Sequence, residues 1–166
     1  QKIGINFWEA RKGANSQPYC HLHYPGTGVG GLCIPIYPKF IIESGKKIGQ
    51  DMNITEFARL TNDLMPKECV KNAIDLLIKN KRIGKTSKVA ILGLGFRGDV
   101  TDSRLSPTYS VVKEFLKNRY TVAIHDPFIH NDDSLPPSVF LSDKLNKVVE
   151  NASLIFISTD HKMYHN

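Results

Sequence analysis

The sequence has no apolar run long enough to cross a lipid bilayer, and its first residues show no pattern typical of a secretory signal peptide. It contains only three cysteines, Cys20, Cys33 and Cys69, and no two of them have CxxC spacing. An odd number of cysteines at such spacings indicates neither a disulfide framework nor a zinc site. We therefore predict a cytoplasmic chain with no metal ion and no contact with a membrane.

Clusters of basic residues interleaved with aromatics, which are typical of nucleic-acid-binding chains, are also missing. The 22 Lys and Arg residues exceed the 16 Asp and Glu residues, which gives a formal net charge of +6. The one dense basic group, KNKR at 79–82, falls at a predicted helix end, where cations complement the helix dipole. A positive balance of this kind suits a small phosphate-bearing ligand, and we predict no nucleic-acid partner.

The pattern of apolar residues changes near the middle of the 166-residue chain. The first part gives helical signals over 3–15, 39–49 and 54–77. After a polar break at 84–87, apolar strands at 88–92, 120–125 and 154–158 alternate with helices at 109–118 and 143–151. Such alternation predicts a parallel, Rossmann-like sheet. We predict an α/β fold, with a helical central segment over 1–84 and a Rossmann-like domain with flanking helices over 85–166.

The helix predicted around 53–80 carries more apolar surface than a small domain covers easily. Two interpretations are open, in which this face either fills the intramolecular core or joins domains and forms a dimer interface. Pro66 should kink the helix or begin a new one, because proline has no N–H and clashes with the preceding turn. Near the start of the chain, Trp8 is expected to anchor the core.

The stretch from Pro25 to Phe40, PGTGVGGLCIPIYPKF, places one thiol among glycines and prolines. The glycines before the thiol are Gly26, Gly28, Gly30 and Gly31, and the prolines are Pro25, Pro35 and Pro38. A loop of this composition has many backbone N–H groups that an anionic ligand can use. Cys33 is then either a small buried residue in a surface turn or a reachable nucleophile. Four glycines within six residues exceed what a turn needs, so we favour the nucleophile.

The segment GLGFRG at 93–98 follows a predicted strand and satisfies the GxGxxG pattern of NAD-binding loops. We predict that it does not bind NAD, because residues 99–106 separate it from the helix that Pro107 begins. Asp126, before Pro127, is expected to form a turn that ends a strand rather than to bind a ribose. The group Thr159-Asp160-His161 is interpreted as a polar cluster at a strand end, with no assigned chemistry.

Arg97 and Arg104 lie on the loop that follows this strand. Two guanidinium groups on one irregular loop are suited to gripping phosphate oxygens. The competing interpretation is that the two arginines neutralise Asp99 and Asp102. The chemistry alone favours neither.

Four segments, GVGGLCIPIYPKF, GLGFRGDVTDSRLSP, HDPF and STDH, resemble the UDP-glucose/GDP-mannose dehydrogenase family, in particular its branch acting on UDP-N-acetylhexosamines such as UDP-N-acetylmannosamine. The resemblance covers most of the chain. It implies NAD-dependent oxidation of the primary alcohol of a UDP-sugar to the acid, by two hydride transfers through a thiohemiacetal and a thioester on Cys33. The substrate-binding residues that it implies are Gly28, Gly30, Gly31, Arg97 and Arg104.

The same resemblance implies a homodimer through the helix around 53–80, and it places the NAD-binding domain before Gln1. Two positions depart from the family pattern, since Leu32 and Tyr37 stand where the family commonly has a histidine and a carboxylate. The loss of an acid near the thiol leaves open which group polarises the hydrolytic water. The alternative function is a non-catalytic nucleotide-binding module that dimerises.

Overall fold

The computed structural model describes residues 3–80 and 87–165. In chain order the elements are α1 (Phe7–Ala14), α2 (Tyr37–Lys47), α3 (Asn53–Lys79), β1 (Lys88–Leu92), α4 (Thr108–Lys117), β2 (Thr121–His125), β3 (Phe140–Ser142), α5 (Leu145–Val149), β4 (Ala152–Ile157) and a short 3-10 helix, η1 (Lys162–Tyr164). The predicted helical first half and alternating second half are confirmed. The predicted domain boundary at 84/85 lies outside the described residues and stays a prediction.

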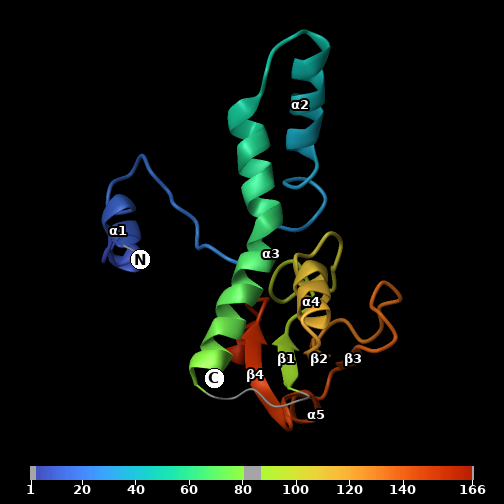
Figure 1. The fold of residues 1–166 in the computed structure, drawn as a ribbon. Helices are drawn as coiled ribbons and strands as arrows, with labels where there is room; N and C mark the ends of the chain where they lie inside the picture. The colour runs from blue at the N-terminus through green and yellow to red at the C-terminus, as the bar shows by residue number, and fades with distance from the viewer. Residues whose placement is uncertain (1–2, 81–86, 166) are drawn as a thin grey trace.

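Four parallel strands form one sheet in the order β3-β2-β1-β4, with β1 and β2 in the interior (Figure 1). The helix α4 connects β1 to β2, and α5 connects β3 to β4. This arrangement confirms the predicted Rossmann-like parallel sheet. The strand β3 was not predicted, because its three residues are too few to give an apolar run.

Alternate residues of the interior strands face opposite sides of the sheet, as the strand period of two requires. Ile91 and Ile124 are fully buried on the side covered by α3 and α4, where they pack with Phe115. Ala90 and Ala123 face the other side and pack against Val148 of α5. Each layer thus receives side chains of a matching size, with large residues under the long helices and alanines under the short one.

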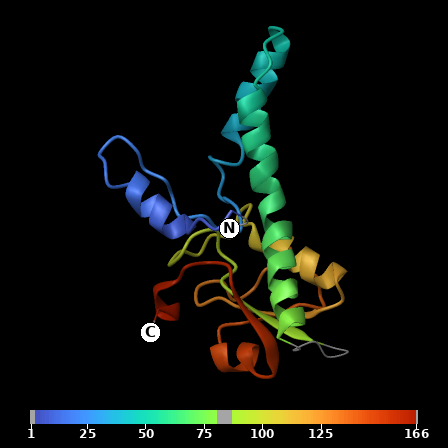
Figure 2. The same cartoon turned by 60° about the vertical axis from the view of Figure 1, so that its left-hand side comes forward.

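The helix α3 runs from the sheet to α2 and forms the long axis of the molecule (Figures 1 and 2). Its second half packs on the sheet, where Val70 and Leu77 are buried. Pro66 lies inside the helix, and Figure 1 shows α3 bending near its middle. The prediction of a kink is therefore confirmed, and the alternative of a second helix starting at Pro66 is wrong. Within the described residues, no helix is both long and apolar enough to cross a membrane.

The helix α1 stands apart from the sheet and from α3 (Figures 1 and 2). None of its residues is buried, and Trp8 is 56% exposed. The prediction that Trp8 anchors the core is therefore wrong. Its ring instead contacts two neighbours, Phe7 at 5.4 Å and Tyr24 at 6.2 Å between ring centroids. Sequence periodicity shows that a residue is apolar but not whether the chain brings a partner to it.

One buried carboxylate, Asp126, fixes the loop after β1 to the end of β2. Its Oδ2 atom accepts the N–H groups of Leu94 (2.7 Å) and Gly95 (3.1 Å), and its Oδ1 atom accepts those of Phe128 (2.9 Å) and Ile129 (3.0 Å). Burial alone would raise the pKa of Asp126, but the four N–H donors outweigh it and hold the pKa below its usual value. The side chain is therefore a buried anion that ends β2 in a turn, as predicted.

His161 joins this arrangement from the end of β4. Its Nδ1 atom accepts the N–H of Asp99 (2.9 Å), so the ring proton is on Nε2, which lies 3.3 Å from Asp126 Oδ2. The ring is fully buried, and it packs against Phe128 and Tyr164 at centroid distances of 5.4 and 5.5 Å. The loop after β1 is consequently held from two strands at once.

Asp126→Asn should lower the free energy of unfolding by about 3 kcal/mol at neutral pH, because an amide nitrogen would then face backbone N–H donors. The folded-state pKa lies below the unfolded one, so the carboxylate contributes stability above about pH 4 and loses that contribution as the pH falls through the folded-state pKa. Denaturant unfolding at several pH values should show the gap between parent and variant closing toward acid pH. Asp133→Asn, at an exposed position, is the matched control. A gap independent of pH would contradict the role of the charge.

Candidate functional site

Cys33 lies in a tight turn immediately before α2. Its carbonyl oxygen accepts the N–H groups of Ile36 (3.1 Å) and Tyr37 (2.9 Å), which closes one helical turn. The side chain is exposed, so the interpretation of Cys33 as a small buried residue is wrong. The turn fixes the backbone of the residue while its sulfur stays open to solvent.

Tyr37 follows Cys33 by four residues and lies on the same side of this turn. A hydrogen bond with the Cys33 side chain raises the pKa of the Tyr37 hydroxyl above its ordinary value. The phenol therefore keeps its proton at neutral pH and can donate a hydrogen bond, whereas a carboxylate at this position would only accept one. The thiol thus has a neutral donor beside it in place of the acid that the family pattern contains.

The glycine loop, residues 26–31, packs against the loop that carries the two arginines. A Cβ atom on Gly30 would lie 2.5 Å from Phe96 Cβ and 2.8 Å from the carbonyl oxygen of Leu105. Gly31 has a φ of +83°, which disfavours a side chain, and its N–H donates to the carbonyl oxygen of Arg104 (3.0 Å). These two glycines are needed for a close contact between loops.

Other positions of the glycine loop are held by α3 and α4. The Val29 N–H donates to the Asn62 side chain (2.9 Å), and a Cβ atom on Gly28 would lie 3.2 Å from Pro107 Cβ. The expectation of many free N–H groups is therefore corrected at residues 29 and 31, whose N–H groups are satisfied within the chain. Sequence reasoning missed Asn62, because it lies 33 positions away on a helix whose pattern does not mark it.

The two arginines have different surroundings. The Arg104 side chain binds the Asp102 carboxylate through Nε (2.9 and 3.1 Å) and Nη2 (2.6 Å), and this contact holds the pKa of Asp102 at about 2. Arg97 is exposed, and among the described residues its guanidinium has no hydrogen-bond or ion-pair partner. The Asp99 carboxylate instead accepts the N–H of Lys162 (3.2 Å). The interpretation that the arginines neutralise nearby carboxylates therefore holds for Arg104, which binds Asp102, and not for Arg97.

The GxGxxG segment does not have the geometry of a dinucleotide loop. The helix α4 begins at Thr108, as the position of Pro107 predicted, so the last glycine is well outside its first turn. Asp126 already binds the N–H groups of Leu94 and Gly95. Thr159 Oγ1 donates to the Gly95 carbonyl oxygen (2.6 Å). The segment therefore does not fit an NAD pyrophosphate, because its amides are used by the protein and the end of β4 lies against it.

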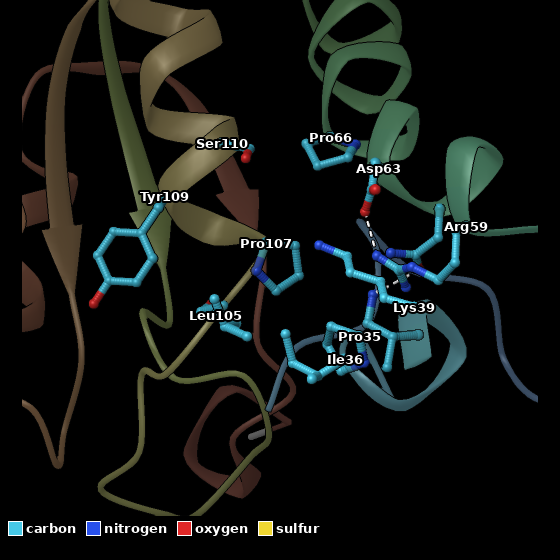
Figure 3. Close-up of a pocket in the computed structure, with 13 residues that line it drawn as sticks. Pro35, Ile36, Lys39, Arg59, Asp63, Pro66, Leu105, Pro107, Tyr109 and Ser110 are labelled. Atoms are coloured by element: carbon cyan, nitrogen blue, oxygen red, sulfur yellow. Dashed lines mark hydrogen bonds and ion pairs between the residues drawn. The ribbon is translucent and has the colours of Figure 1, made fainter. Parts of the chain in front are cut away.

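A cavity of about 320 Å³ lies on one side of the glycine loop, between α2, α3 and the start of α4 (Figure 3). Lys39 extends into it from α2, and Arg59 lies at its wall in an ion pair with Asp63. Sequence reasoning singled out neither of these cations. They come from two different helices, and only the packing of α2 on α3 brings them to one cavity.

A second cavity, of about 730 Å³, is lined by α1 and the segment that follows it, by α3 and by the end of β4. Its lining includes Trp8 and Tyr24. Cys33, Arg97 and Arg104 line neither cavity, and all three have exposed side chains. Within residues 3–80 and 87–165, no group of three or more His, Cys, Asp or Glu side chains is placed to hold a metal ion.

Comparison with known proteins gives relatives for the whole chain. UDP-N-acetyl-D-mannosamine dehydrogenase from Methanocaldococcus jannaschii is 37% identical over 100% of this chain and 35% of its own length. NDP-N-acetyl-D-galactosaminuronic acid dehydrogenase from Ralstonia solanacearum is 29% identical over 98% of this chain and 37% of its own. The chain therefore spans about a third of the length of the curated relatives it matches.

Solved structures agree with this comparison. The NDP-N-acetyl-D-galactosaminuronic acid dehydrogenase of Methanosarcina mazei superposes with a TM-score of 0.85 at 31% identity, covering 99% of this chain and 36% of that one. The UDP-D-ManNAc dehydrogenase of Pyrococcus horikoshii gives 0.78 at 30% identity, covering 98% and 36%. Residues 1–64 match the central domain of the UDP-glucose/GDP-mannose dehydrogenase family, and residues 90–166 match its UDP binding domain. The chain belongs to the UDP-glucose/GDP-mannose dehydrogenase family.

Proposed function

We propose that this chain supplies the nucleophile and the UDP-binding loop of an NAD-dependent dehydrogenase that oxidises C6 of a UDP-hexose, such as UDP-N-acetylmannosamine or a related UDP-sugar, to the uronic acid. The observation that carries the proposal is the exposed Cys33 turn, joined to the arginine loop through the hydrogen bond from Gly31 to Arg104. Through that contact the loop with the thiol touches the loop with Arg97, whose guanidinium has no partner among the described residues.

In this proposal Cys33 is the nucleophile that forms a covalent bond with the sugar. Its thiolate attacks the C6 aldehyde carbon of the half-oxidised sugar, and the oxyanion takes a proton to give a thiohemiacetal. Loss of hydride from C6 and of the proton from the hydroxyl group gives a thioester. Water then adds to the thioester carbon and expels the Cys33 thiol, and the acid that forms releases a proton to give the carboxylate. NAD, when bound, is the acceptor of both hydrides. The Tyr37 hydroxyl is placed to donate a hydrogen bond beside the sulfur.

The described residues do not supply the NAD site of this proposal. Segment 93–98, which follows a strand and has the dinucleotide pattern, has the N–H groups of Leu94 and Gly95 bound by Asp126, and the end of β4 lies against it. We therefore assign NAD binding to residues outside those that the structure describes. The cytoplasm is the location that we propose, since the substrates and NAD are cytoplasmic metabolites.

The second candidate is a nucleotide-binding module that dimerises without catalysis. The observation that favours it is the pair of residues beside the thiol, Leu32 and Tyr37, which stand in place of the histidine and the carboxylate of the family pattern. Both candidates bind UDP, so UDP binding does not separate them. The two candidates differ in whether the protein oxidises the bound UDP-sugar to the acid.

Cys33→Ser in the intact protein should lower the rate of acid formation from UDP-N-acetylmannosamine and NAD on the order of a thousandfold or more, because the covalent route is lost. UDP affinity should stay within about twofold, since the nucleotide is held elsewhere. Acid formation is followed through the appearance of NADH. Cys20→Ser is the matched control and should leave the rate unchanged. A parent protein that forms no acid would leave only the binding module, and equal non-zero rates in Cys33→Ser and parent would overturn the role of Cys33 as the nucleophile.

Arg97→Ala should weaken UDP binding about 10- to 100-fold, because a charge-assisted hydrogen bond contributes about 1.5–3 kcal/mol. Arg104→Ala should have a smaller effect, since Arg104 must first leave Asp102. Titration calorimetry at one fixed salt concentration measures both. Lys113→Ala, at an exposed position on α4, is the control. Equal losses in all three variants, with a steep salt dependence, would indicate general polyanion binding instead.

We also propose that the protein forms a homodimer through α2 and the first half of α3. The exposed apolar side chains there are Phe40 (63% exposed), Ile41 (55%), Ile54 (88%), Phe57 (70%), Leu60 (56%) and Leu64 (46%). A surface of this kind on two neighbouring helices is typical of an interface.

Phe57→Glu should convert the dimer to a monomer, because the interface would have to bury an unpaired charge. Analytical ultracentrifugation at micromolar concentration measures the change. The melting temperature of the monomeric unit should alter little, since Phe57 makes few contacts within the chain. Lys67→Glu, on the sheet-proximal half of α3, should remain dimeric. A parent protein that is monomeric at these concentrations would overturn the proposal.

A further inference from the structure

A carboxylate on the segment between β2 and β3 reaches the loop that carries the arginines. Asp132 Oδ2 accepts the hydroxyl of Ser103 (3.1 Å) and also the hydroxyl of Tyr109, and Asp132 Oδ1 accepts the N–H of Ser134 (2.8 Å). One side chain therefore joins three segments, which are the arginine loop, the first turn of α4 and the segment after β2. Figure 3 shows the Tyr109 hydroxyl pointing away from the cavity that its ring lines.

The ionisation states of Asp132 and Tyr109 favour a strong hydrogen bond between them. Burial alone would raise the pKa of Asp132, but the hydrogen bonds from Tyr109, Ser134 and Ser103 outweigh it and hold the pKa below its usual value. Burial and the contact with Asp132 raise the pKa of Tyr109 to about 12. At neutral pH the acid is thus ionised and the phenol protonated, so the phenol donates to an anion.

The turn that Asp132 holds, residues 103–105, supports the glycine loop. Leu105 has a φ of +51°, a left-handed conformation that a leucine adopts only when its surroundings impose it. On one side of the turn, Ser103 is bound to Asp132. On the other side, the Arg104 carbonyl oxygen accepts the N–H of Gly31, two residues before Cys33. A chain of direct contacts therefore runs from Asp132 to the cysteine turn.

We infer that Asp132, acting with Ser103 and Tyr109, is a positioning residue for the proposed reaction. It fixes the 103–105 turn on which the glycine loop rests, and so it sets where the Cys33 sulfur lies relative to a UDP-sugar held by Arg97. Arg97 itself lies on a part of the loop that Asp126 and His161 hold, so we expect its contact with UDP to depend little on Asp132. The inference rests on the proposed function.

The test compares Asp132→Ala and Tyr109→Phe with the parent in the intact protein. Each variant should lower kcat for acid formation about tenfold, because a displaced thiol reacts poorly with the bound aldehyde. The UDP dissociation constant should change less than threefold. The double variant should fall no further than Asp132→Ala alone, since both changes break one contact. Asp133→Ala, at the neighbouring exposed position, should match the parent in all measurements.

A second measurement does not need turnover. Because the two loops touch, saturating UDP should change the rate at which iodoacetamide alkylates Cys33, and this response should be lost in Asp132→Ala and Tyr109→Phe. Peptide mass spectrometry reads the modification at Cys33 alone. If the parent oxidises no UDP-sugar, the proposed function fails, while the alkylation response still decides the role of Asp132.

Two outcomes would overturn the inference. One is a lowered melting temperature with kcat and the alkylation response unchanged, which would make Asp132 a purely structural contact. The other is a loss of UDP affinity equal to that of Arg97→Ala, which would place Asp132 in the binding of the nucleotide. Tyr109→Phe keeps its ring and removes one oxygen, so it decides between these outcomes even if Asp132→Ala fails to fold.

Discussion

The buried Asp126 carboxylate is the constraint on which the rest of the second half depends. A buried anion is tolerated only when donors surround it, and here backbone N–H groups from two separate loops supply them. The loop after β1 therefore has one position, with its N–H groups turned inward toward the end of β2. In this orientation Arg97 is exposed, and the N–H groups of Leu94 and Gly95 face Asp126 instead of a ligand.

The glycine loop illustrates a related principle. Glycines near a proposed nucleophile suggest backbone donors for a ligand, yet two of them here permit a close approach between loops. Gly30 leaves room for Phe96 and the Leu105 backbone, and Gly31 donates its N–H to Arg104. The loop is consequently packed between the central segment and the part of the chain that matches the UDP binding domain. For the proposed covalent chemistry this packing matters, because a thiol on a mobile loop would not hold its distance to a bound sugar.

The two halves of helix α3 contact different parts of the molecule. Its second half is an ordinary core helix, with Val70 and Leu77 buried against the sheet. Its first half carries Asn62, which holds the glycine loop, and exposed apolar residues such as Phe57. The bend at Pro66 separates these two halves. A single helix therefore joins the proposed interface, the cysteine loop and the sheet.

Local periodicity and short motifs were enough to predict the alternation of strands and helices, the beginning of α4 directly after Pro107, and the family. The sequence also indicated the exposed thiol of Cys33, since glycines and prolines around a cysteine prevent regular burial. Only the folded structure could show that Asp126 closes the GxGxxG segment, that Arg104 is paired while Arg97 has no partner in the described part of the chain, and that Asp132 supports the turn beside Gly31. It also decided that Trp8 is exposed. These outcomes depend on which distant groups meet, and hydrogen bonds between residues 30 or more positions apart leave no periodic trace in the chain.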